Sequence, residues 1–263
     1  MGAILITGAF GGIGRAVTEL FCKKGYAVFA LDRRCLRTPE GVYPIEADVT
    51  SEESLAAAFR AVREKTDSLD AILHFAGIYM LDSLVEMKDE DFSRILDINL
   101  RGAFLVNKTF LPLLARNSRI LITTSELAPL DPLPFTGIYA VTKAALDKYA
   151  YSLAMELQLL GIRVSVLRSG AVATGMLGVS TQALARFCEK TKTFSPNAAR
   201  FKRVVERVEA RCIPPEKIAR KAEKILSSRS PRFAYSINRN PLLLLLNALP
   251  KRLQLFIIGR ILK

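Results

Sequence analysis

The chain has few of the residues that bind metals or form disulfides. Its 263 residues include a single histidine and four cysteines. No two cysteines form a C-x-x-C pair, and none clusters with the histidine. This pattern argues against a zinc module and a disulfide framework, and it fits reduced thiols in a cytosol. We therefore expect no metal site.

Long apolar runs are also absent. No run reaches the roughly 18 apolar residues that a membrane-spanning helix requires. The first predicted strand begins at Ala3, which leaves no room for a secretory signal, so we expect a cytoplasmic protein. At this length, and with 50% hydrophobic residues, one large α/β domain without an interdomain linker is expected.

Acidic residues are too few to balance the basic ones. The 38 Lys and Arg exceed the 25 Asp and Glu by 13 charges, which predicts an anionic partner: nucleic acid, anionic lipid or an acidic substrate. Much of the excess lies in residues 200–232, whose pattern is typical of the solvated face of a helix. Because no aromatic-interleaved basic motif accompanies it, we expect no nucleic-acid binding.

Glycines gather after the first apolar run. Residues 3–7 precede T-G-A-F-G-G-I-G and an amphipathic stretch that ends at Gly25. In a strand, glycine loop and helix, backbone N–H groups and the helix N-terminus bind a pyrophosphate. Gly8, Gly12 and Gly14 would allow the tight turn and the close approach of that group. Three glycines are also ordinary turn chemistry, so the assignment depends on the residues further along the chain.

An acidic residue ends the second apolar run. Asp32 follows residues 27–31 and lies 18 positions after Gly14. The carboxylate that binds adenosine ribose hydroxyls is expected about 20 positions on. This carboxylate would repel a 2′-phosphate, which favours NAD over NADP. Arg33 and Arg34 follow directly, and an arginine here can pair with a phosphate, so NADP stays the alternative.

Apolar runs alternate with helical patterns along the rest of the chain. Further strands are predicted at residues 42–47, 71–75, 120–122, 162–167 and 232–237. The alternation predicts a doubly wound parallel sheet, the Rossmann fold. Thr50 and Glu53 form a capping box that predicts a helix after the third strand. Asp48, at that strand's end, is expected to meet the adenine ring or to cap a turn.

The fourth predicted strand ends in His74, Phe75, Ala76 and Gly77. Ala76 and Gly77 are small enough to let a cofactor lie close to the backbone. His74 lies within an apolar run, so we expect a buried, hydrogen-bonded core histidine rather than a catalytic base.

Three reactive groups are predicted to meet after the fifth strand. Tyr139 and Lys143 stand four apart, so on a helix they share one face, with about 5–6 Å between their Cβ atoms. A nearby ammonium favours the phenolate and lowers a tyrosine pKa that is ordinarily about 10, which suits proton transfer at neutral pH. Ser125 follows the strand at 120–122, at the strand end where open α/β sheets bind ligands. Asn99 is an amide among apolar neighbours, which is costly to bury without partners and indicates a role.

In order and spacing, these motifs resemble the short-chain dehydrogenase/reductase family over nearly the whole chain. They are T-G-x-x-x-G-I-G, the terminal Asp of the second strand, D-V, A-G, N-x-x-G, Ser and Y-x-x-x-K. The resemblance implies that hydride moves between a nicotinamide and the carbon that bears the substrate oxygen. It implies Tyr139 as proton donor or acceptor, Lys143 as holder of the nicotinamide ribose, Ser125 as the group that polarises the carbonyl, and Asn99 as the group that fixes a relay water. The implied cofactor contacts are Gly8, Phe10, Gly12, Ile13, Gly14, Asp32, Arg33, Asp48, Val49, Ala76, Gly77, Tyr139, Lys143, Gly170, Val172 and Thr174.

Two positions depart from the family's pattern. His74-Phe75 replaces the usual asparagine pair before Ala-Gly, and Ser169-Gly170 replaces the usual proline-glycine. Neither change touches the acid–base groups, so we expect turnover to survive both. Thr174 is retained as the expected contact to the nicotinamide amide.

Residues 175–212 are expected to cover the substrate site. Glycines at the start and mixed apolar patterns, which include Met176, Leu177, Leu184 and Phe187, suit a mobile lid. A pair of surface helices is the alternative.

Residues 241–263 form an apolar extension of the domain at 1–240. Their ending resembles the branch of the family that includes hydroxysteroid and retinol dehydrogenases, which act on large apolar alcohols. Three roles stay open: a wall of the substrate pocket, a subunit interface, or a helix lying on a membrane. In the last case Lys251, Arg252, Arg260 and Lys263 would face anionic headgroups.

The predicted function is that of an NAD(P)-dependent oxidoreductase. It would interconvert a secondary alcohol and a ketone on a bulky hydrophobic substrate such as a steroid or bile acid. A non-catalytic nucleotide sensor would need only the glycine loop and Asp32. An acyl-carrier-linked 3-ketoacyl reductase would suit a basic groove but not the apolar tail. The resemblance also implies a homodimer or homotetramer.

Overall fold

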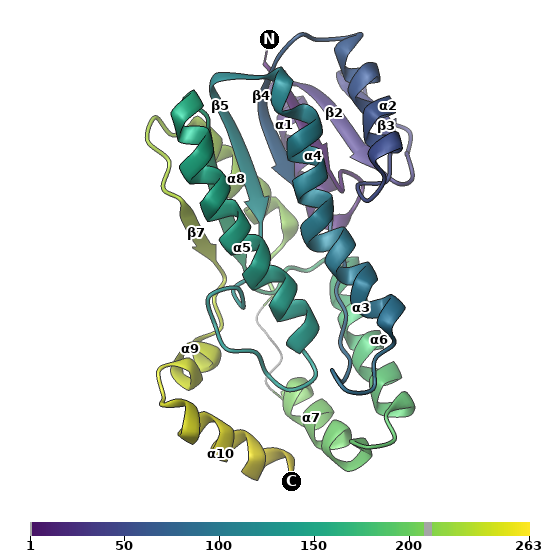
Figure 1. Cartoon of the computed structure of the whole chain (residues 1–263), viewed down its shortest axis with the longest axis vertical. Coiled ribbons are helices and arrows are strands. Elements are labelled where there is room, and N and C mark those ends of the chain that lie inside the picture. Colours follow the sequence, from purple (N-terminus) through teal and green to yellow (C-terminus); the bar gives the residue numbers. More distant parts are fainter. Residues whose placement is uncertain (1, 208–211) are drawn as a thin grey trace.

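The computed structural model describes residues 2–207 and 212–263, without the side chains of 175–181 and 207. Within these residues, seven parallel strands form one sheet in the order β3-β2-β1-β4-β5-β6-β7 (Figure 1). The order reverses direction between β1 and β4, which is where doubly wound sheets bind ligands. The predicted fold is confirmed. The strands are β1 (Ala3–Thr7), β2 (Ala27–Asp32), β3 (Val42–Glu46), β4 (Leu69–His74), β5 (Leu114–Thr123), β6 (Arg163–Ser169) and β7 (Ala234–Ile237).

Helices cover both faces of the sheet, so alternate residues of each strand enter different cores. Leu5 packs in one core with α2, α4 and α5, whereas Ile4 and Ile6 pack in the other with α1 and α8. Burial on both faces explains why the strands read as continuous apolar runs. The helices are α1 (Gly12–Lys23), α2 (Glu52–Arg63), α3 (Asp89–Leu96), α4 (Gly102–Phe110), α5 (Gly137–Leu157), α6 (Gly175–Lys190), α7 (Ser195–Arg207), α8 (Pro215–Ser227), α9 (Pro241–Asn247) and α10 (Lys251–Leu262).

Two local predictions are wrong. The capping box at α2 is replaced by Ser51, whose side chain accepts from the Ser54 N–H at 3.2 Å. Thr50 does not cap the helix, because its N–H and hydroxyl both donate to the Asp48 carboxylate, at 2.8 and 2.7 Å. Asp48 therefore closes a turn.

The start of β5 also differs from the prediction. The strand begins at Leu114, well before residue 120, and its polar first half hides it in the sequence. Leu114 pairs with Leu69, the register then shifts, and Asn117 takes a left-handed φ of 76°. This irregularity lets an arginine-rich surface segment join the sheet.

The predicted lid and tail lie at the carboxyl ends of the strands. α6, α7, α9 and α10 all extend beyond the strand tips (Figure 1). Leu184 and Phe187 of α6 are buried against Phe201 of α7 and Leu262 of α10. The side chains of Met176 and Leu177, and all of residues 208–211, lie outside the described part. Among the described helices, none has the length and apolarity needed to cross a bilayer.

Candidate active site

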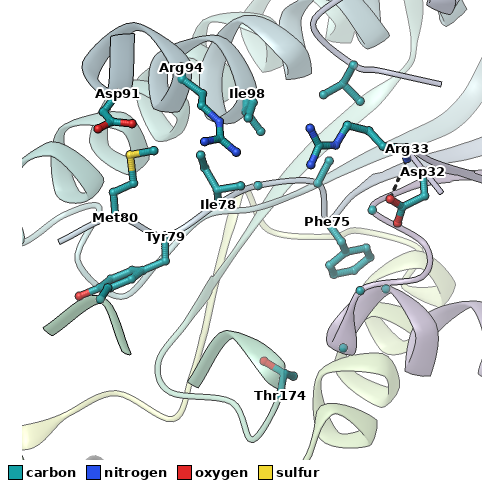
Figure 2. Close-up of a pocket in the computed structure, with 18 of the residues that line it drawn as sticks. Asp32, Arg33, Phe75, Ile78, Tyr79, Met80, Asp91, Arg94, Ile98 and Thr174 are labelled. Carbon is teal, nitrogen blue, oxygen red and sulfur yellow. Dashed lines mark hydrogen bonds between the residues drawn. The ribbon is translucent and has the colours of Figure 1, made fainter. Parts of the chain in front are cut away.

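A cavity of about 760 Å³ opens at the strand ends around the point where the sheet reverses (Figure 2). Its lining combines the glycine loop with residues that follow β2, β3 and β4. The sequence-predicted cofactor residues that line it are Gly8, Gly12, Ile13, Gly14, Asp32, Arg33, Asp48, Val49, Ala76, Gly77 and Thr174.

The glycine loop tolerates no side chains at two of its positions. A Cβ on Gly14 would lie 2.0 Å from the Gly8 carbonyl oxygen, and one on Gly12 would lie 2.5 Å from the Thr174 Cβ. Gly8 has a φ of +65°. The loop therefore turns tightly enough to present backbone N–H groups at the start of α1, as a pyrophosphate site requires.

Asp32 is held in place by the backbone. Its carboxylate accepts from the Phe10 N–H at 3.0 Å and from the Arg33 N–H at 2.8 Å. Phe10 thus acts on the cavity through Asp32 and does not line it. Each oxygen keeps acceptor capacity for a ribose hydroxyl.

Ser125, Tyr139 and Lys143 come together as the sequence predicts. A hydrogen bond joins Ser125 to the Tyr139 hydroxyl, and the Lys143 Nζ lies 5.7 Å from the centroid of the Tyr139 ring. The Lys143 Nζ also donates to the Thr123 carbonyl at 3.3 Å. Ser125 and Lys143 are buried. The arrangement can move a proton at the Tyr139 oxygen.

The predicted lowering of the Tyr139 pKa is wrong in direction. Burial raises the pKa of Tyr139 to about 12, and nearby Tyr79 adds to this, while the Ser125 hydrogen bond acts against it. Burial also lowers the pKa of Lys143 to about 8. Desolvation therefore outweighs the attraction that the four-residue spacing indicated.

Gly77 connects these groups to the cavity. It lines the cavity, and a Cβ there would lie 3.6 Å from the Lys143 Nζ and 3.2 Å from the Asn99 Oδ1. Lys143, Asn99, Ser125 and Tyr139 are not among the residues that line the cavity, and Tyr139 packs against the lining residue Tyr79. Gly77 therefore places the polar atoms of Lys143 and Asn99 next to the cavity lining.

Asn99 lies in a π-helical turn, Asp97–Arg101, between α3 and α4. Its Oδ1 accepts from the Ile78 N–H at 2.8 Å, and its Nδ2 donates to the Ile78 carbonyl and to the Thr142 hydroxyl, at 3.0 and 3.1 Å. The buried amide thus ties the segment after β4 to α5. These bonds provide the partners that its burial requires.

His74 is a core residue, as predicted. Its Nε2 lies 2.8 Å from the Asn107 Oδ1, and the Asn107 Nδ2 donates to the Tyr149 hydroxyl at 3.1 Å. Burial lowers the pKa of His74 to about 4, so the ring is neutral at neutral pH. Because the Asn107 amide donates to Tyr149, its oxygen is the acceptor for His74.

Besides Phe10, Tyr139 and Lys143, two further predicted cofactor contacts do not line the cavity. A Cβ on Gly170 would lie 1.9 Å from the Asn238 carbonyl oxygen, so this glycine lets the end of β6 pack against the segment after β7. Val172 forms a bridge with Ile213. Neither residue lines the cavity within the described part of the chain.

Two residues of the site were not predicted. Tyr79 lines the cavity and packs against Tyr139, with ring centroids 4.9 Å apart. Arg94 extends its guanidinium from α3 into the same part of the cavity as that of Arg33 (Figure 2). Tyr79 stands two positions after Gly77, which is a signal that could have identified it. Arg94 had no signal, because it lies on the exposed-looking face of a charged helix.

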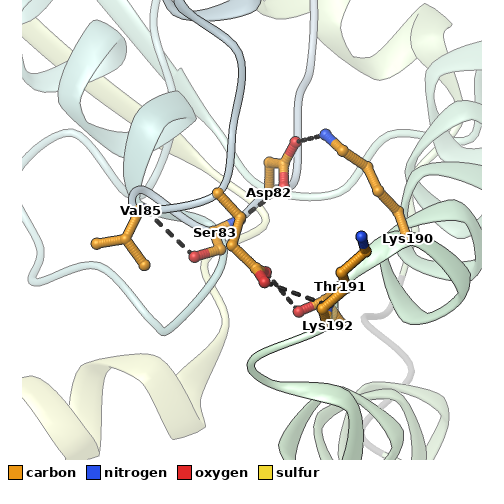
Figure 3. Close-up of polar contacts among 7 residues, drawn as sticks. Asp82, Ser83, Val85, Lys190, Thr191 and Lys192 are labelled. Carbon is orange, nitrogen blue, oxygen red and sulfur yellow. Dashed lines mark hydrogen bonds and ion pairs between the residues drawn. The ribbon is translucent and has the colours of Figure 1, made fainter.

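The loop after β4 is attached to the far end of α6 (Figure 3). Lys190 and Asp82 form an ion pair at 2.7 Å. Glu86 accepts from the Thr191 hydroxyl at 2.5 Å and from the N–H groups of Lys192 and Thr193, at 3.1 and 2.8 Å. These bonds lower the pKa of Glu86 to about 2. We call the Glu86 contacts the Glu86 clamp.

Comparison with known proteins agrees with this geometry. Residues 2–185 match the short chain dehydrogenase family. The chain belongs to the short-chain dehydrogenase family. It is 32% identical over 190 residues to the NADPH-dependent 1-acyldihydroxyacetone phosphate reductase of Schizosaccharomyces pombe, a match that spans 68% of this chain and 64% of that relative. It is 30% identical over 193 residues to mouse (Mus musculus) estradiol 17-beta-dehydrogenase 2, spanning 67% of this chain and 49% of that relative.

A solved short-chain dehydrogenase from Streptomyces avermitilis has the same fold. It superposes with a TM-score of 0.77 at 20% identity and covers 99% of this chain and 96% of its own. The predicted family and fold are confirmed. Short-chain dehydrogenases are oxidoreductases that use NAD(H) or NADP(H), which bears out the predicted classes of enzyme and cofactor.

Proposed function

We propose that this short-chain dehydrogenase interconverts a secondary alcohol and a ketone on a bulky hydrophobic substrate, with Tyr139 as the acid–base group. The observation that carries the proposal is the Tyr139 hydroxyl bonded to Ser125, with Lys143 beside it and Gly77 between Lys143 and the cavity. A nucleotide sensor would need only the glycine loop and Asp32. It would have no use for this buried polar cluster.

The glycine loop and Asp32 would hold a dinucleotide, which when bound would supply or accept the hydride. In reduction, Tyr139 donates its phenolic proton to the ketone oxygen while Ser125 orients that oxygen, and the charged Lys143 stabilises the resulting phenolate. In oxidation the phenolate takes the alcohol proton. With a pKa raised to about 12, Tyr139 holds its proton at neutral pH, which suits the reductive direction.

Two features support a large apolar substrate. Apolar and aromatic side chains, among them Tyr79, Met80, Leu81 and Phe187, line the cavity beside the acid–base groups. The names of the two curated relatives describe an acylated ketone and a steroid alcohol, which are both bulky. We therefore extend to this protein a preference for a steroid-like, bile-acid-like or acylated ketone.

A substrate panel tests this function directly. Oxidation of NADH or NADPH is followed with steroid ketones, bile-acid ketones, long-chain acyl ketones and short ketones. We expect kcat/KM for the best bulky ketone to exceed that for acetone by at least about tenfold, since two further buried methylene groups are worth about that factor. Dinucleotide binding without turnover on any compound would support the sensor function instead.

Asp32→Asn is expected to relax the preference for NAD. The two backbone donors hold the Asp32 carboxylate at the expected ribose position, where it would repel a 2′-phosphate, and Arg33 and Arg94 line the same cavity and would attract that phosphate in the variant. A change of one charge pair is worth about 1–3 kcal/mol, so the NADP/NAD ratio of kcat/KM should rise about 10- to 100-fold.

The matched control is Asp91→Asn, which removes a carboxylate elsewhere in the cavity lining. It should leave the ratio nearly unchanged. A wild-type protein that already prefers NADP would show that Arg33 and Arg94 outweigh Asp32.

A further inference from the structure

The last two helices expose more large apolar side chains than their length explains. Leu242 and Leu245 of α9 are 54% and 66% exposed, and Leu255 and Phe256 of α10 are 74% and 63% exposed. Single exposed leucines are ordinary on protein surfaces, but a concentration on two consecutive helices marks an interaction surface.

On α10 these side chains form a continuous stripe with cations at both ends. Positions i, i+3, i+4, i+7, i+8 and i+11 share one helix face. Gly259, at the middle of the stripe, has open space around it, since a Cβ there would meet nothing within 4 Å. The α10 stripe consists of Arg252, Leu255, Phe256, Gly259, Arg260 and Lys263.

The opposite face of α10 is attached to the protein. The buried Gln254 donates to the Leu249 carbonyl at 2.9 Å. The carbonyl of the buried Leu262 accepts from Asn197 and Arg200 of α7, at 2.7 and 3.2 Å. The fold therefore holds the helix with the α10 stripe outward, so binding to a partner carries no free-energy cost for ordering the helix.

The charge of this region selects the partner. Residues 224–263 contain eight Lys or Arg and no Asp or Glu. An isologous contact between two copies would bring the cations of both stripes together, which is unfavourable. A pocket wall is also not supported, because no residue of 241–263 is among the described residues that line the cavity. Apolar side chains between cations suit an anionic lipid surface.

We propose that α9 and α10 dock the protein on an anionic membrane surface. Leu255 and Phe256 enter the interface, and Arg252, Arg260 and Lys263 contact the lipid phosphates. α9 and α10 lie at the carboxyl ends of the strands, so docking brings the end of the molecule that holds the cavity close to the bilayer (Figure 1). The inference does not depend on the proposed reaction.

Co-sedimentation of the full chain with vesicles tests the proposal. Vesicles of phosphatidylcholine are compared with vesicles that also contain phosphatidylglycerol. Each cation near an anionic surface contributes about fivefold in affinity, so binding should be at least about tenfold tighter to the anionic vesicles. The double variant Leu255→Glu/Phe256→Glu should lose at least about tenfold of that affinity, and Arg252→Gln/Arg260→Gln a similar factor.

Leu159→Glu is the matched control. Leu159 is 82% exposed but follows α5, at the opposite end of the strands (Figure 1). It should bind vesicles like the wild type, and all variants should retain their thermal midpoints and dinucleotide affinities. Equal binding of the wild type to both kinds of vesicle would overturn the proposal, as would an equal loss in Leu159→Glu. Loss of a homo-oligomer in the double variant with unchanged vesicle binding would also overturn it and assign the stripe to a subunit contact.

Discussion

Tyr139→Phe is expected to lower kcat by about 10²–10⁴-fold, the range that general acid–base catalysis supplies. The variant keeps the ring that packs against Tyr79 and removes only the hydroxyl that Ser125 contacts. Dinucleotide affinity should be nearly unchanged, because the variant leaves the glycine loop, Asp32 and the other residues that line the cavity in place. Steady-state kinetics and a fluorescence titration with NADH measure the two quantities.

Tyr149→Phe is a matched control for this change. It removes a hydroxyl from the same helix, where the partner is Asn107 in the core. It should cost some stability through the unpaired Asn107 amide but leave kcat within the same order of magnitude. If Tyr139→Phe retained full turnover, another group would have to transfer the proton.

Lys143→Met is expected to abolish activity and yet stabilise the fold. Burial lowers the pKa of Lys143 to about 8, which means that at neutral pH the native state carries the cost of a desolvated ammonium. A shift of this size corresponds to about 3 kcal/mol. The variant also loses the hydrogen bond to the Thr123 carbonyl, which offsets about 1 kcal/mol of this gain. The free energy of unfolding should therefore rise by about 1–2 kcal/mol.

The pH dependence of the free energy of unfolding distinguishes removal of the desolvated ammonium from better packing in Lys143→Met. Below pH 8 Lys143 is charged in both states, and the full cost is present. Between about pH 8 and 10.5 the native state loses the proton first, so wild-type stability rises with pH across this window relative to Lys143→Met. Chemical denaturation at pH 7 and pH 10 measures the change.

Lys148→Met, at an exposed position of the same helix, should show no such difference. A gap between wild type and Lys143→Met that stayed constant from pH 7 to pH 10 would contradict the assignment of the cost to the ammonium.

The sequence identified what depends on order along the chain. Local patterns predict the succession of strands, the glycine loop, and the positions of Asp32 and Tyr139. In a doubly wound sheet, each of these patterns has a fixed place relative to the strand ends. The start of β5 was missed because its pairing with Leu69 is a long-range contact that the polar residues before 120 conceal. The helix cap was misassigned because Asp48, a charged acceptor, takes both donors of Thr50.

The pKa values of the site residues were harder to predict than which residues form the site. The spacing of Tyr139 and Lys143 correctly indicated proximity, but their pKa values depend on burial, which no spacing reports. Arg94 of α3 and Arg33, which follows β2, meet at one cavity only because of the tertiary fold, which no local pattern reports. The family resemblance implies Gly170 as a cofactor contact, whereas in the structure its lack of a side chain allows the close approach of Asn238.

The Glu86 clamp determines how a pH–rate profile of this protein is to be interpreted. A carboxylate whose pKa is lowered to about 2 contributes its stabilisation above its ordinary value and loses it only as the pH falls through 2. The connection between α6 and α7 therefore keeps an ionised Glu86 as the acceptor of its hydrogen bonds throughout the neutral and alkaline range. A change in rate between pH 7 and pH 10 is consequently not caused by loss of the Glu86 clamp, and Lys143, whose pKa is lowered to about 8, is the active-site group that exchanges its proton in this window.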